Sequence, residues 1–388
     1  MRVRWDIFCR VIDNFGDIGI CWRLAQQLHT EHHGQVRLWV DDLHCFQRIC
    51  ADIQPERARQ RLSVGIEVMR WGSDEDQCSE LAGCAEVVIE AFACDLPTWY
   101  LAQMAAAEPK PVWLNLEYLS AENWVLDCHA LPSPHPQLPL QKHFFFPGFV
   151  PGTGGLLRER HLLENRSNWL ELDGKSQLLA ELGIPHPERY QQLICLFAYS
   201  HHELLSLLTA WGQQEHEQLC LVPEGALANE LRTLIPQLAA DRSFSIGNLR
   251  LQLLPFISQL QFDQLLWCAD INFVRGEDSL VRAMWAGKPF VWQLYRQAEE
   301  AHLDKLRAFW QLFSKQMPAS LQQALWQFWL HWNQQKELVS PWQQLVEIVP
   351  QWQQHCLDWR TEQCKQDDLA KNLVRFVENK FILTPNFS

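Results

Sequence analysis

Two stretches of the sequence combine carboxylates with turn residues where a strand-like run gives way to a helix-like one. Residues 13–17 read Asp-Asn-Phe-Gly-Asp, and residues 275–279 read Arg-Gly-Glu-Asp-Ser. Doubly wound sheets bind their ligands beyond the carboxyl ends of the strands, which is where such turns lie. A carboxylate there can act as a general base, and the N-terminus of the following helix favours a phosphate. The two stretches indicate chemistry on an activated, phosphorylated donor.

The first stretch can supply a catalytic pair of carboxylates. Asp13 and Asp17 are four residues apart and separated by a glycine turn, so one can act as the base while the other orients it. Neighbouring like charge or partial burial would raise the pKa of a carboxylate into a useful range. The alternative is structural, with Asp13 as a turn residue and Asp17 as the N-cap of the next helix. The Gly-x-Gly-x-x-Gly pattern of a dinucleotide site is absent.

The second stretch lies within residues 271–292, which read as strand, turn, helix, turn and strand. Asp278 or Ser279 is expected to cap the helix, and Gly287 is expected to end it. Arg275 and the Ser279 hydroxyl can then hold a phosphate at the positive end of that helix. The alternative is an ordinary capped turn in a strand–helix–strand unit.

Two further pairs of residues lie at the ends of strand-like runs in the second half of the chain: Phe197 and Tyr199 end one predicted strand, and Phe256 and Gln259 follow another. Phe197 can stack on a nucleotide base and Tyr199 can bind a phosphate through its hydroxyl, or both can be ordinary core aromatics. Phe256 can stack on a base while Gln259 hydrogen-bonds the edge of that base. Neither pair by itself identifies a ligand.

The sequence contains no recognisable metal, nucleophile or disulfide motif. His201 and His202 are adjacent and therefore face apart, which argues against a metal-binding pair. Cys94 has no identifiable partner histidine, so we interpret it as a core cysteine. The thirteen cysteines include no C-x-x-C pair, and no serine nucleophile elbow or P-loop occurs. These cysteines predict a reduced, cytoplasmic protein.

Strand-like and helix-like runs alternate in two series, which predicts an α/β fold with two mostly parallel sheets. The predicted strands are residues 5–11, 36–40, 66–70, 87–91 and 112–116 in the first series, and 193–199, 219–222, 249–254, 271–274 and 290–292 in the second. One helix is predicted over residues 226–240.

The domains are expected at residues 1–150, at 151–190 (linker and start of the second domain) and at 191–365, with a last helix within 366–388 that packs back on the first domain. Residues 132–155 are rich in proline and glycine and are predicted to be loop and linker. Their glycines, followed by Arg158 and Arg160, form either an anion-binding loop or a plain connector.

The bulk composition limits the partners of the protein. The chain has 388 residues, a formal net charge of −13 and 47% hydrophobic residues. A chain this acidic is a poor general binder of nucleic acid or anionic membrane, because phosphate contacts need clustered Lys and Arg. No apolar run approaches the ~18 residues of a membrane span. Neither nucleic acid nor membrane is an expected partner.

Six segments of the chain, taken together, resemble the EarP family, the bacterial protein-arginine rhamnosyltransferases that act on elongation factor P. The segments are residues 11–25, 90–97, 115–122, 154–160 and 275–279, the last together with residues 302–305. The resemblance covers most of the chain and the combination of motifs is specific, although residues 318–363 contain no motif to compare.

The resemblance implies a GT-B fold, in which two Rossmann-like domains face each other across a cleft, with the acceptor side at residues 1–150 and the nucleotide sugar at 191–365. It implies an inverting transfer of L-rhamnose from dTDP-β-L-rhamnose to an arginine side chain of elongation factor P, without a metal or other cofactor. Asp17 is the candidate general base, and Asp13 and Glu277 are also implicated in catalysis. Donor contacts are implied for Asn14, Phe15, Gly16, Phe197, Tyr199, Phe256, Gln259, Arg275, Gly276, Asp278 and Ser279.

An arginine acceptor poses a chemical problem, because a guanidinium has a pKa above ~12 and is a poor nucleophile. Carboxylates such as Asp17 and Glu277 can hold it and take a proton as the C–N bond forms. Two alternatives stand beside this interpretation. One is another GT-B nucleotide-sugar enzyme, such as an epimerase or a transferase to a small acceptor. The other is a non-catalytic, partner-binding protein of the same fold.

Overall fold

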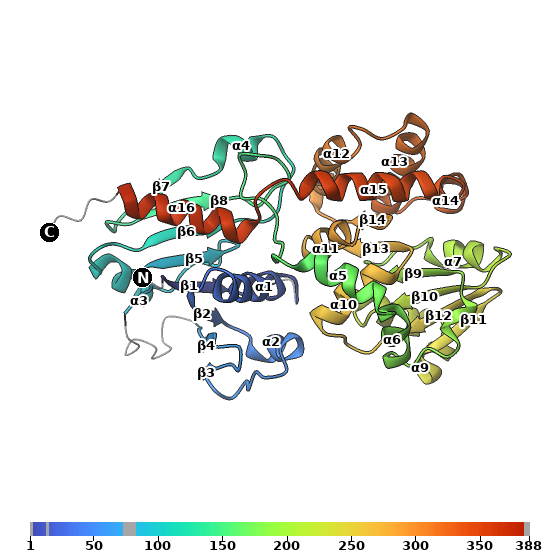
Figure 1. Ribbon diagram of the computed structural model, residues 1–388, viewed down its shortest axis with the longest axis horizontal. Helices are drawn as coiled ribbons and strands as arrows, with labels where there is room; N and C mark the ends of the chain where they lie inside the picture. Colours follow the sequence, from blue (N-terminus) through green and yellow to red (C-terminus); the bar gives the residue numbers. More distant parts are fainter. Residues whose placement is uncertain (1–2, 13–14, 73–82, 384–388) are drawn as a thin grey trace. The chain divides into compact units, whose positions relative to one another are not determined.

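The computed structural model describes residues 3–12, 15–72 and 83–383. The chain forms two compact units, whose elements are labelled in Figure 1. The first unit is Met1–Arg160 together with Gln366–Ser388, and the second is His161–Lys365. The division after Arg160 falls within residues 151–190, the segment predicted to hold the linker and the start of the second domain.

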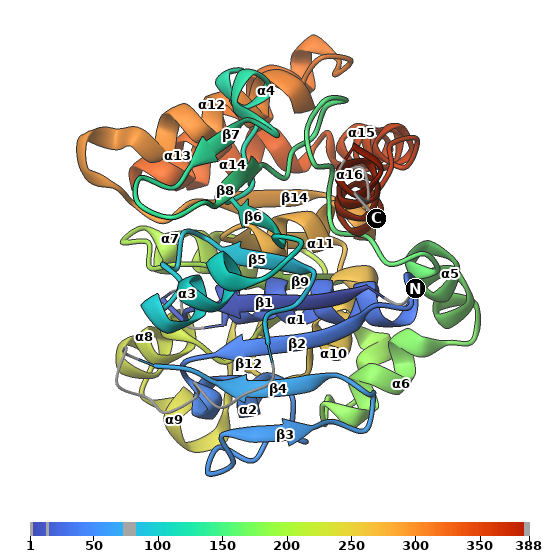
Figure 2. The same ribbon diagram turned by 90° about the vertical axis from the view of Figure 1, so that its left-hand side faces the viewer.

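The first unit is built on a sheet whose order, over the described residues, is β3-β4-β2-β1-β5-β6-β8-β7. Figure 2 shows these strands side by side. The inner strands are parallel, and the edge strands β3 and β7 pair antiparallel with their neighbours. The strands are β1 (Arg4–Cys9), β2 (Gln35–Val40), β3 (Arg59–Arg61), β4 (Glu67–Arg70), β5 (Val87–Ala91), β6 (Val112–Leu116), β7 (Pro132–Pro134) and β8 (Gln141–Phe145).

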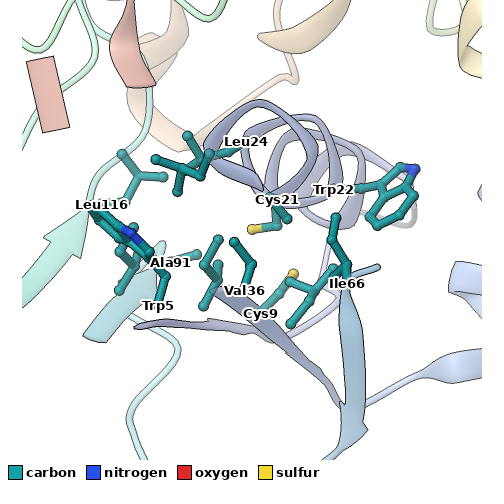
Figure 3. Close-up of a cluster of buried hydrophobic side chains, with 14 of the residues drawn as sticks. Trp5, Cys9, Cys21, Trp22, Leu24, Val36, Ile66, Ala91 and Leu116 are labelled. Carbon is teal, nitrogen blue, oxygen red and sulfur yellow. The ribbon is translucent and has the colours of Figure 1, made fainter. Parts of the chain in front are cut away.

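Helices cover both faces of this sheet because its inner strands are apolar on both sides. They are α1 (Gly16–Thr30), α2 (Leu43–Ile49), α3 (Thr98–Ala106), α4 (Trp124–Cys128) and α16 (Leu369–Leu383). On one face Cys21 of α1 lies against Cys9 of β1 and Val36 of β2, as Figure 3 shows, and Trp22 and Leu24 belong to the same buried cluster. On the other face Tyr100 of α3 packs with Phe8 and Trp39. The sheet is therefore the middle layer of an α/β/α unit.

Helix α16 returns to the first unit from the far end of the chain. Leu369, Leu373 and Val377 are almost fully buried in the same cluster as α1. The backbone at the start of the helix is also tied down, because the Leu369 N–H donates to the Leu156 carbonyl at 2.9 Å. A side chain at Gly155 would meet the Asp367 carbonyl at 2.5 Å, so this close approach requires glycine.

The second unit has a sheet of order β11-β12-β10-β9-β13-β14 over the described residues, parallel except for β11. The strands are β9 (Gln192–Leu196), β10 (Gln218–Val222), β11 (Ser243–Ile246), β12 (Leu249–Leu253), β13 (Ile271–Arg275) and β14 (Phe290–Gln293). The α-helices are α5 (Leu162–Glu171), α6 (Gly174–Glu181), α7 (Leu204–Gly212), α8 (Ala226–Leu234), α9 (Gln237–Asp241), α10 (Gln259–Cys268), α11 (Asp278–Ala286), α12 (Ala301–Phe313), α13 (Ala319–Gln334), α14 (Val339–Val346) and α15 (Val349–Gln363).

Aromatic side chains form much of the core of the second unit. Trp329 of α13 stacks on Phe309 and Phe313 of α12 with ring planes 5° and 8° apart, and it is fully buried. Trp332 packs 5.0 Å from Phe273 of β13, which links α13 to the middle of the sheet. The tryptophan-rich end of the chain, for which the sequence contains no motif, therefore serves as packing for this unit.

Two of the predicted segments were wrong, and in both the error concerned proline. Residues 132–155 are not all loop and linker, because β7 and β8 pair there and extend the first sheet. Pro132 and Pro134 are tolerated because β7 is an edge strand, where a missing N–H donor does little harm. The helix predicted over residues 226–240 is divided into α8 and α9 at Pro236, whose ring prevents an uninterrupted helix.

The buried face of α16 generates a stability prediction. Leu373→Ala should lower the free energy of unfolding by roughly 2–5 kcal/mol, because it opens a cavity in the core of the first unit. Urea unfolding followed by tryptophan fluorescence measures the loss. Asn379→Ala, at an exposed position of the same helix, is the matched control and should change stability little. Equal losses in the two variants would contradict the burial argument.

Candidate functional site

Asp17 is a buried carboxylate in the first turn of α1, just beyond the carboxyl end of β1. Its side chain is 2% exposed, and both of its oxygens accept hydrogen bonds. The Ile12 N–H donates to Oδ2 at 3.0 Å, and the Tyr118 hydroxyl donates to Oδ1 at 3.2 Å. The N-terminus of α1 adds a favourable dipole for negative charge. This geometry holds a carboxylate in one orientation, as a general base requires.

Asp17 is not the N-cap of α1, which corrects the structural alternative for this residue. The helix begins at Gly16 with Phe15 as the N-cap residue, whose side chain makes no capping hydrogen bond. Phe15 is half-buried, and its ring lies 5.8 Å from the Arg48 guanidinium carbon. The other two predicted residues of this motif, Asp13 and Asn14, lie outside the described residues.

Tyr118, which follows β6, was not singled out as a functional residue from the sequence. Its ring stacks on Phe92, with centroids 4.5 Å apart and planes 17° apart. Phe92 follows β5 and has a φ of +56°, a left-handed conformation that is strained for an aromatic residue. The Asn115 side-chain oxygen accepts the next N–H, that of Ala93, at 3.2 Å. The loop after β5 is thus held in place against the ring of Tyr118, whose hydroxyl donates to Asp17.

More carboxylates lie at the same edge of the first sheet. Glu90, 1% exposed, pairs with Lys142 at 3.1 Å and accepts the Asp95 N–H at 3.2 Å. Glu117 accepts a hydrogen bond from the side-chain amide of Asn115. Burial raises the pKa of Glu117, Lys142 opposes this, and the negative charge of Glu90 adds to it. The only signal in the sequence was that these acids end neighbouring parallel strands.

In the second unit, the structure brings together two motifs that the sequence presented separately. The Arg275 guanidinium carbon lies 4.8 Å from the ring centroid of Phe197 and 4.6 Å from that of Tyr199. Both aromatics follow β9, and Arg275 ends the neighbouring parallel strand β13. Such cation–π contacts contribute on the order of 0.5–2 kcal/mol and fix the plane of the guanidinium. Within the described part of the chain, Arg275 has no carboxylate partner.

The aromatic cluster extends to a residue that the sequence did not suggest. Tyr295, which follows β14, is 70% exposed and lies edge-on to Tyr199 at 5.7 Å. The Tyr199 N–H donates to the Gln293 side-chain oxygen at 2.7 Å, which ties the loop after β9 to β14. An exposed ring beside a held guanidinium is a surface on which a planar group can stack.

The turn before α11 is closed by Ser279, and this differs from the prediction. Its hydroxyl donates to the Arg275 carbonyl and accepts the Arg275 N–H at 3.1 Å, so it does not cap the helix. The N-cap residue is Glu277, whose side chain makes no capping bond. Gly276 supplies the positive φ of +66° that the turn needs, and Asp278 is the first residue of the helix. Gly287 ends α11 with a φ of +64°, as predicted.

A buried ion pair holds α11 in position. Arg282 of α11 donates to both oxygens of Asp263 of α10, at 2.9 Å and 2.6 Å. Both side chains are less than 5% exposed, so the two charges neutralise each other in a dry environment. The pair fixes α10 and α11 against each other and thereby sets the position of residues 275–279.

The remaining predicted positions lie in the same unit. Phe256 and Gln259 both follow β12, and Gln259 is the first residue of α10. Both are half-buried. The start of α10 is closed by a capping box, in which Ser258 and Gln261 satisfy each other's backbone N–H groups.

The glycine- and arginine-rich segment before residue 160 has a structural explanation. Arg158 donates to the Gln366 carbonyl at 3.0 Å, and the Arg160 N–H donates to Glu31 at 2.8 Å. The two arginines line a pocket of about 460 Å³ between α1 and α16, whose walls also carry Asp368 and Glu378. The mixed charge does not favour a free anion there.

No group of three or more His, Cys, Asp or Glu side chains among the described residues is gathered as metal ligands would be. No helix of the described chain has the length and apolar character needed to cross a bilayer.

Comparison with known proteins connects these features to a family. A family model described as "Elongation-Factor P (EF-P) rhamnosyltransferase EarP" matches residues 5–378. A protein-arginine rhamnosyltransferase of Pseudomonas aeruginosa is 45% identical over 377 residues, which cover 96% of this chain and 98% of that protein. One of Pseudomonas putida is 43% identical over 382 residues, covering 98% of this chain and 100% of the relative.

A solved structure gives the same result. It is described as the "structural basis for EarP-mediated arginine glycosylation of translation elongation factor EF-P". It matches this chain with a TM-score of 0.69 and 32% identity, over 97% of this chain and 99% of that one.

Two Rossmann-like domains, each with polar side chains beyond the carboxyl ends of parallel strands, define the protein as a glycosyltransferase of the GT-B fold. The family match extends over nearly the whole chain. The chain therefore belongs to the EarP family and is an enzyme, a protein-arginine rhamnosyltransferase.

The contact between Tyr118 and Asp17 generates a prediction about activity. Tyr118→Phe removes a hydrogen bond that orients the carboxylate and should lower the transfer rate roughly ten- to a hundredfold, since such a bond contributes about 1.5–3 kcal/mol. Steady-state assays with the rhamnosyl donor and the protein acceptor measure the rate. Donor affinity should be unchanged.

Tyr190→Phe, in the second unit, is the matched control, because that tyrosine contacts Arg189 and not Asp17. A Tyr118→Phe enzyme as fast as the control would show that the Tyr118 hydroxyl is not needed to orient Asp17.

Proposed function

We propose that this enzyme transfers L-rhamnose, with inversion, from dTDP-β-L-rhamnose to an arginine side chain of translation elongation factor P. The observation that carries the proposal is Asp17, a buried carboxylate with both oxygens held, in a chain of the EarP family. The family description names the elongation factor, and the relatives are named for arginine and rhamnose. We also infer a cytoplasmic location, where the acceptor works and where free thiols such as buried Cys195 and Cys220 persist.

The first chemical step concerns the acceptor. An arginine guanidinium is protonated and must lose a proton as it attacks. Asp17 takes that proton from the attacking nitrogen while the new C–N bond forms to the anomeric carbon. The product guanidinium keeps its positive charge, and the proton remains on Asp17 until it passes to solvent. Two further carboxylates belong to the proposed catalytic site. Asp13 is included because it lies in the same motif as Asp17, and Glu117 because it follows the end of β6.

The second step is the departure of the nucleotide. The bond between the anomeric carbon and the phosphate oxygen breaks, and its electron pair leaves with dTDP. Inversion follows if the nitrogen attacks the face opposite the diphosphate. We assign the negative charge of the leaving group to the N-terminus of α11 and to Arg275. Glu277 then faces the cation-like sugar.

Recognition of the thymine nucleotide is assigned to the aromatic residues of the second unit. Phe197, Tyr199 and Phe256 offer rings near the ends of β9 and β12, and Gln259 can hydrogen-bond the edge of the base. Gly276, Asp278 and Ser279 shape the turn beside the diphosphate. The remaining donor contacts in the proposal, Asn14, Phe15 and Gly16, come from the first unit.

The function is tested by direct transfer. The enzyme is incubated with dTDP-β-L-rhamnose and elongation factor P, and the acceptor is analysed by mass spectrometry for one deoxyhexose on an arginine. Transfer should continue in excess EDTA, because the charge of the leaving group is assigned to protein groups and not to a metal. Donor turnover without any change in the protein acceptor would instead identify a small-acceptor enzyme or an epimerase.

The role of Asp17 has its own test. Asp17→Asn keeps the shape of the side chain but cannot accept the proton, so transfer should fall by at least about a hundredfold. Binding of dTDP, measured by calorimetry, should survive. Gln26→Glu, at a half-buried position of the same helix, is the control for a change of charge on α1. Loss of nucleotide binding in Asp17→Asn would make Asp17 a binding residue and not the base.

A further inference from the structure

Lys305 of α12 forms an ion pair with Glu277, the carboxylate beside the turn that begins α11. Lys305 Nζ lies 3.6 Å from Glu277 Oε1. The two side chains are 32% and 18% exposed, so the pair is screened from water more than a surface ion pair is. It joins the turn before α11 to α12 within the second unit.

The Glu277 carboxylate has two possible partners, the N-terminus of α11 and the Lys305 ammonium group. It is the N-cap residue of α11, and the helix N-terminus attracts negative charge. Asp and Ser make the best caps because their short side chains reach back to the first-turn N–H groups. The Glu277 side chain makes no such bond and is found beside Lys305. The ion pair therefore opposes collapse of the carboxylate onto the end of the helix.

The helix that carries Lys305 is firmly anchored. Its neighbours His302, Leu303 and Leu306 are all at most 3% exposed. The His302 ring nitrogen Nδ1 accepts the Gln297 N–H at 3.3 Å, which ties the loop before α12 to the helix. Because α12 is anchored, the backbone that carries Lys305 is fixed in position. The Lys305 ammonium group can therefore hold the Glu277 side chain in one place.

We propose that Lys305 is a positioning residue for Glu277, and that it keeps the N-terminus of α11 open for the donor diphosphate. The inference rests on the function proposed above, since it takes a nucleoside diphosphate as the ligand of that helix end. Lys305 acts through Glu277 and does not itself contact the nucleotide. Without it, the Glu277 carboxylate turns toward the helix and competes with the diphosphate for the same N–H groups.

A double-mutant cycle tests this role by binding alone. Affinity for dTDP is measured by calorimetry in the wild-type enzyme, in Lys305→Met, in Glu277→Gln and in the double variant. Lys305→Met should weaken dTDP binding about three- to tenfold, the effect expected for a carboxylate at a helix end. In the Glu277→Gln background the same substitution should cost nothing further, because no carboxylate remains to compete.

Two variants serve as controls. Lys305→Arg keeps the positive charge and should restore most of the affinity. Arg307→Met removes a cation from the same helix, where it pairs with exposed Asp304, and should leave dTDP binding unchanged. Thermal unfolding of each variant separates misfolding from a loss of binding, and Lys305→Gln replaces Lys305→Met if the latter fails to fold.

The possible results of these binding measurements distinguish a positioning role of Lys305 from the alternatives. An equal loss in both backgrounds would make Lys305 a direct phosphate ligand and overturn the inference. Unchanged affinity with a lowered melting temperature would reduce the pair to a structural contact and overturn it as well. Wild-type enzyme that does not bind dTDP would refute the proposed donor, and the inference with it. Additive losses in an enzyme that binds dTDP and transfers rhamnose would refute only the inference.

Discussion

The parallel arrangement of the strands is the constraint on which both candidate sites depend. In a parallel sheet, all carboxyl ends lie along one edge, so loops far apart in sequence become neighbours. In the first unit this places Asp17, after β1, within hydrogen-bond distance of Tyr118, after β6. In the second it places Phe197 and Tyr199, after β9, next to the proposed diphosphate ligand Arg275 of β13. The buried cores of the two units hold the strands, and therefore the loops at their carboxyl ends, in fixed positions.

The two units differ in the charge they present at these edges. The first holds carboxylates: Asp17 with its two donors, Glu90 with Lys142, and Glu117, whose pKa burial raises. The second presents a guanidinium framed by aromatic rings and a helix N-terminus, both suited to negative charge. The proposed reaction, which joins a cationic acceptor to an anionic donor, needs both kinds of surface.

The alternation of strands and helices could be predicted from the sequence because apolar periodicity is a local property. β5 and β6 were predicted with their observed bounds, and Gly287 was recognised as the end of α11. Contacts between distant loops could not be predicted. The bond from Tyr118 to Asp17 spans 101 positions, and Lys305 is 28 positions from Glu277. The role of the Ser279 hydroxyl was also missed, because Ser is equally suited to capping a helix and to closing the turn before it.

The turns before α1 and α11 show how similar local sequences can serve opposite electrostatic purposes. Each places an acid at the start of a helix whose dipole attracts it. Asp17 lies inside the first turn with both oxygens occupied, so the field of α1 stabilises a charge that belongs to the protein. Glu277 is held aside by Lys305, so the field of α11 remains available to a charge that arrives with a ligand. The difference lies in the partners of the two carboxylates, a tyrosine hydroxyl and a lysine ammonium, each supplied by a different part of its own unit.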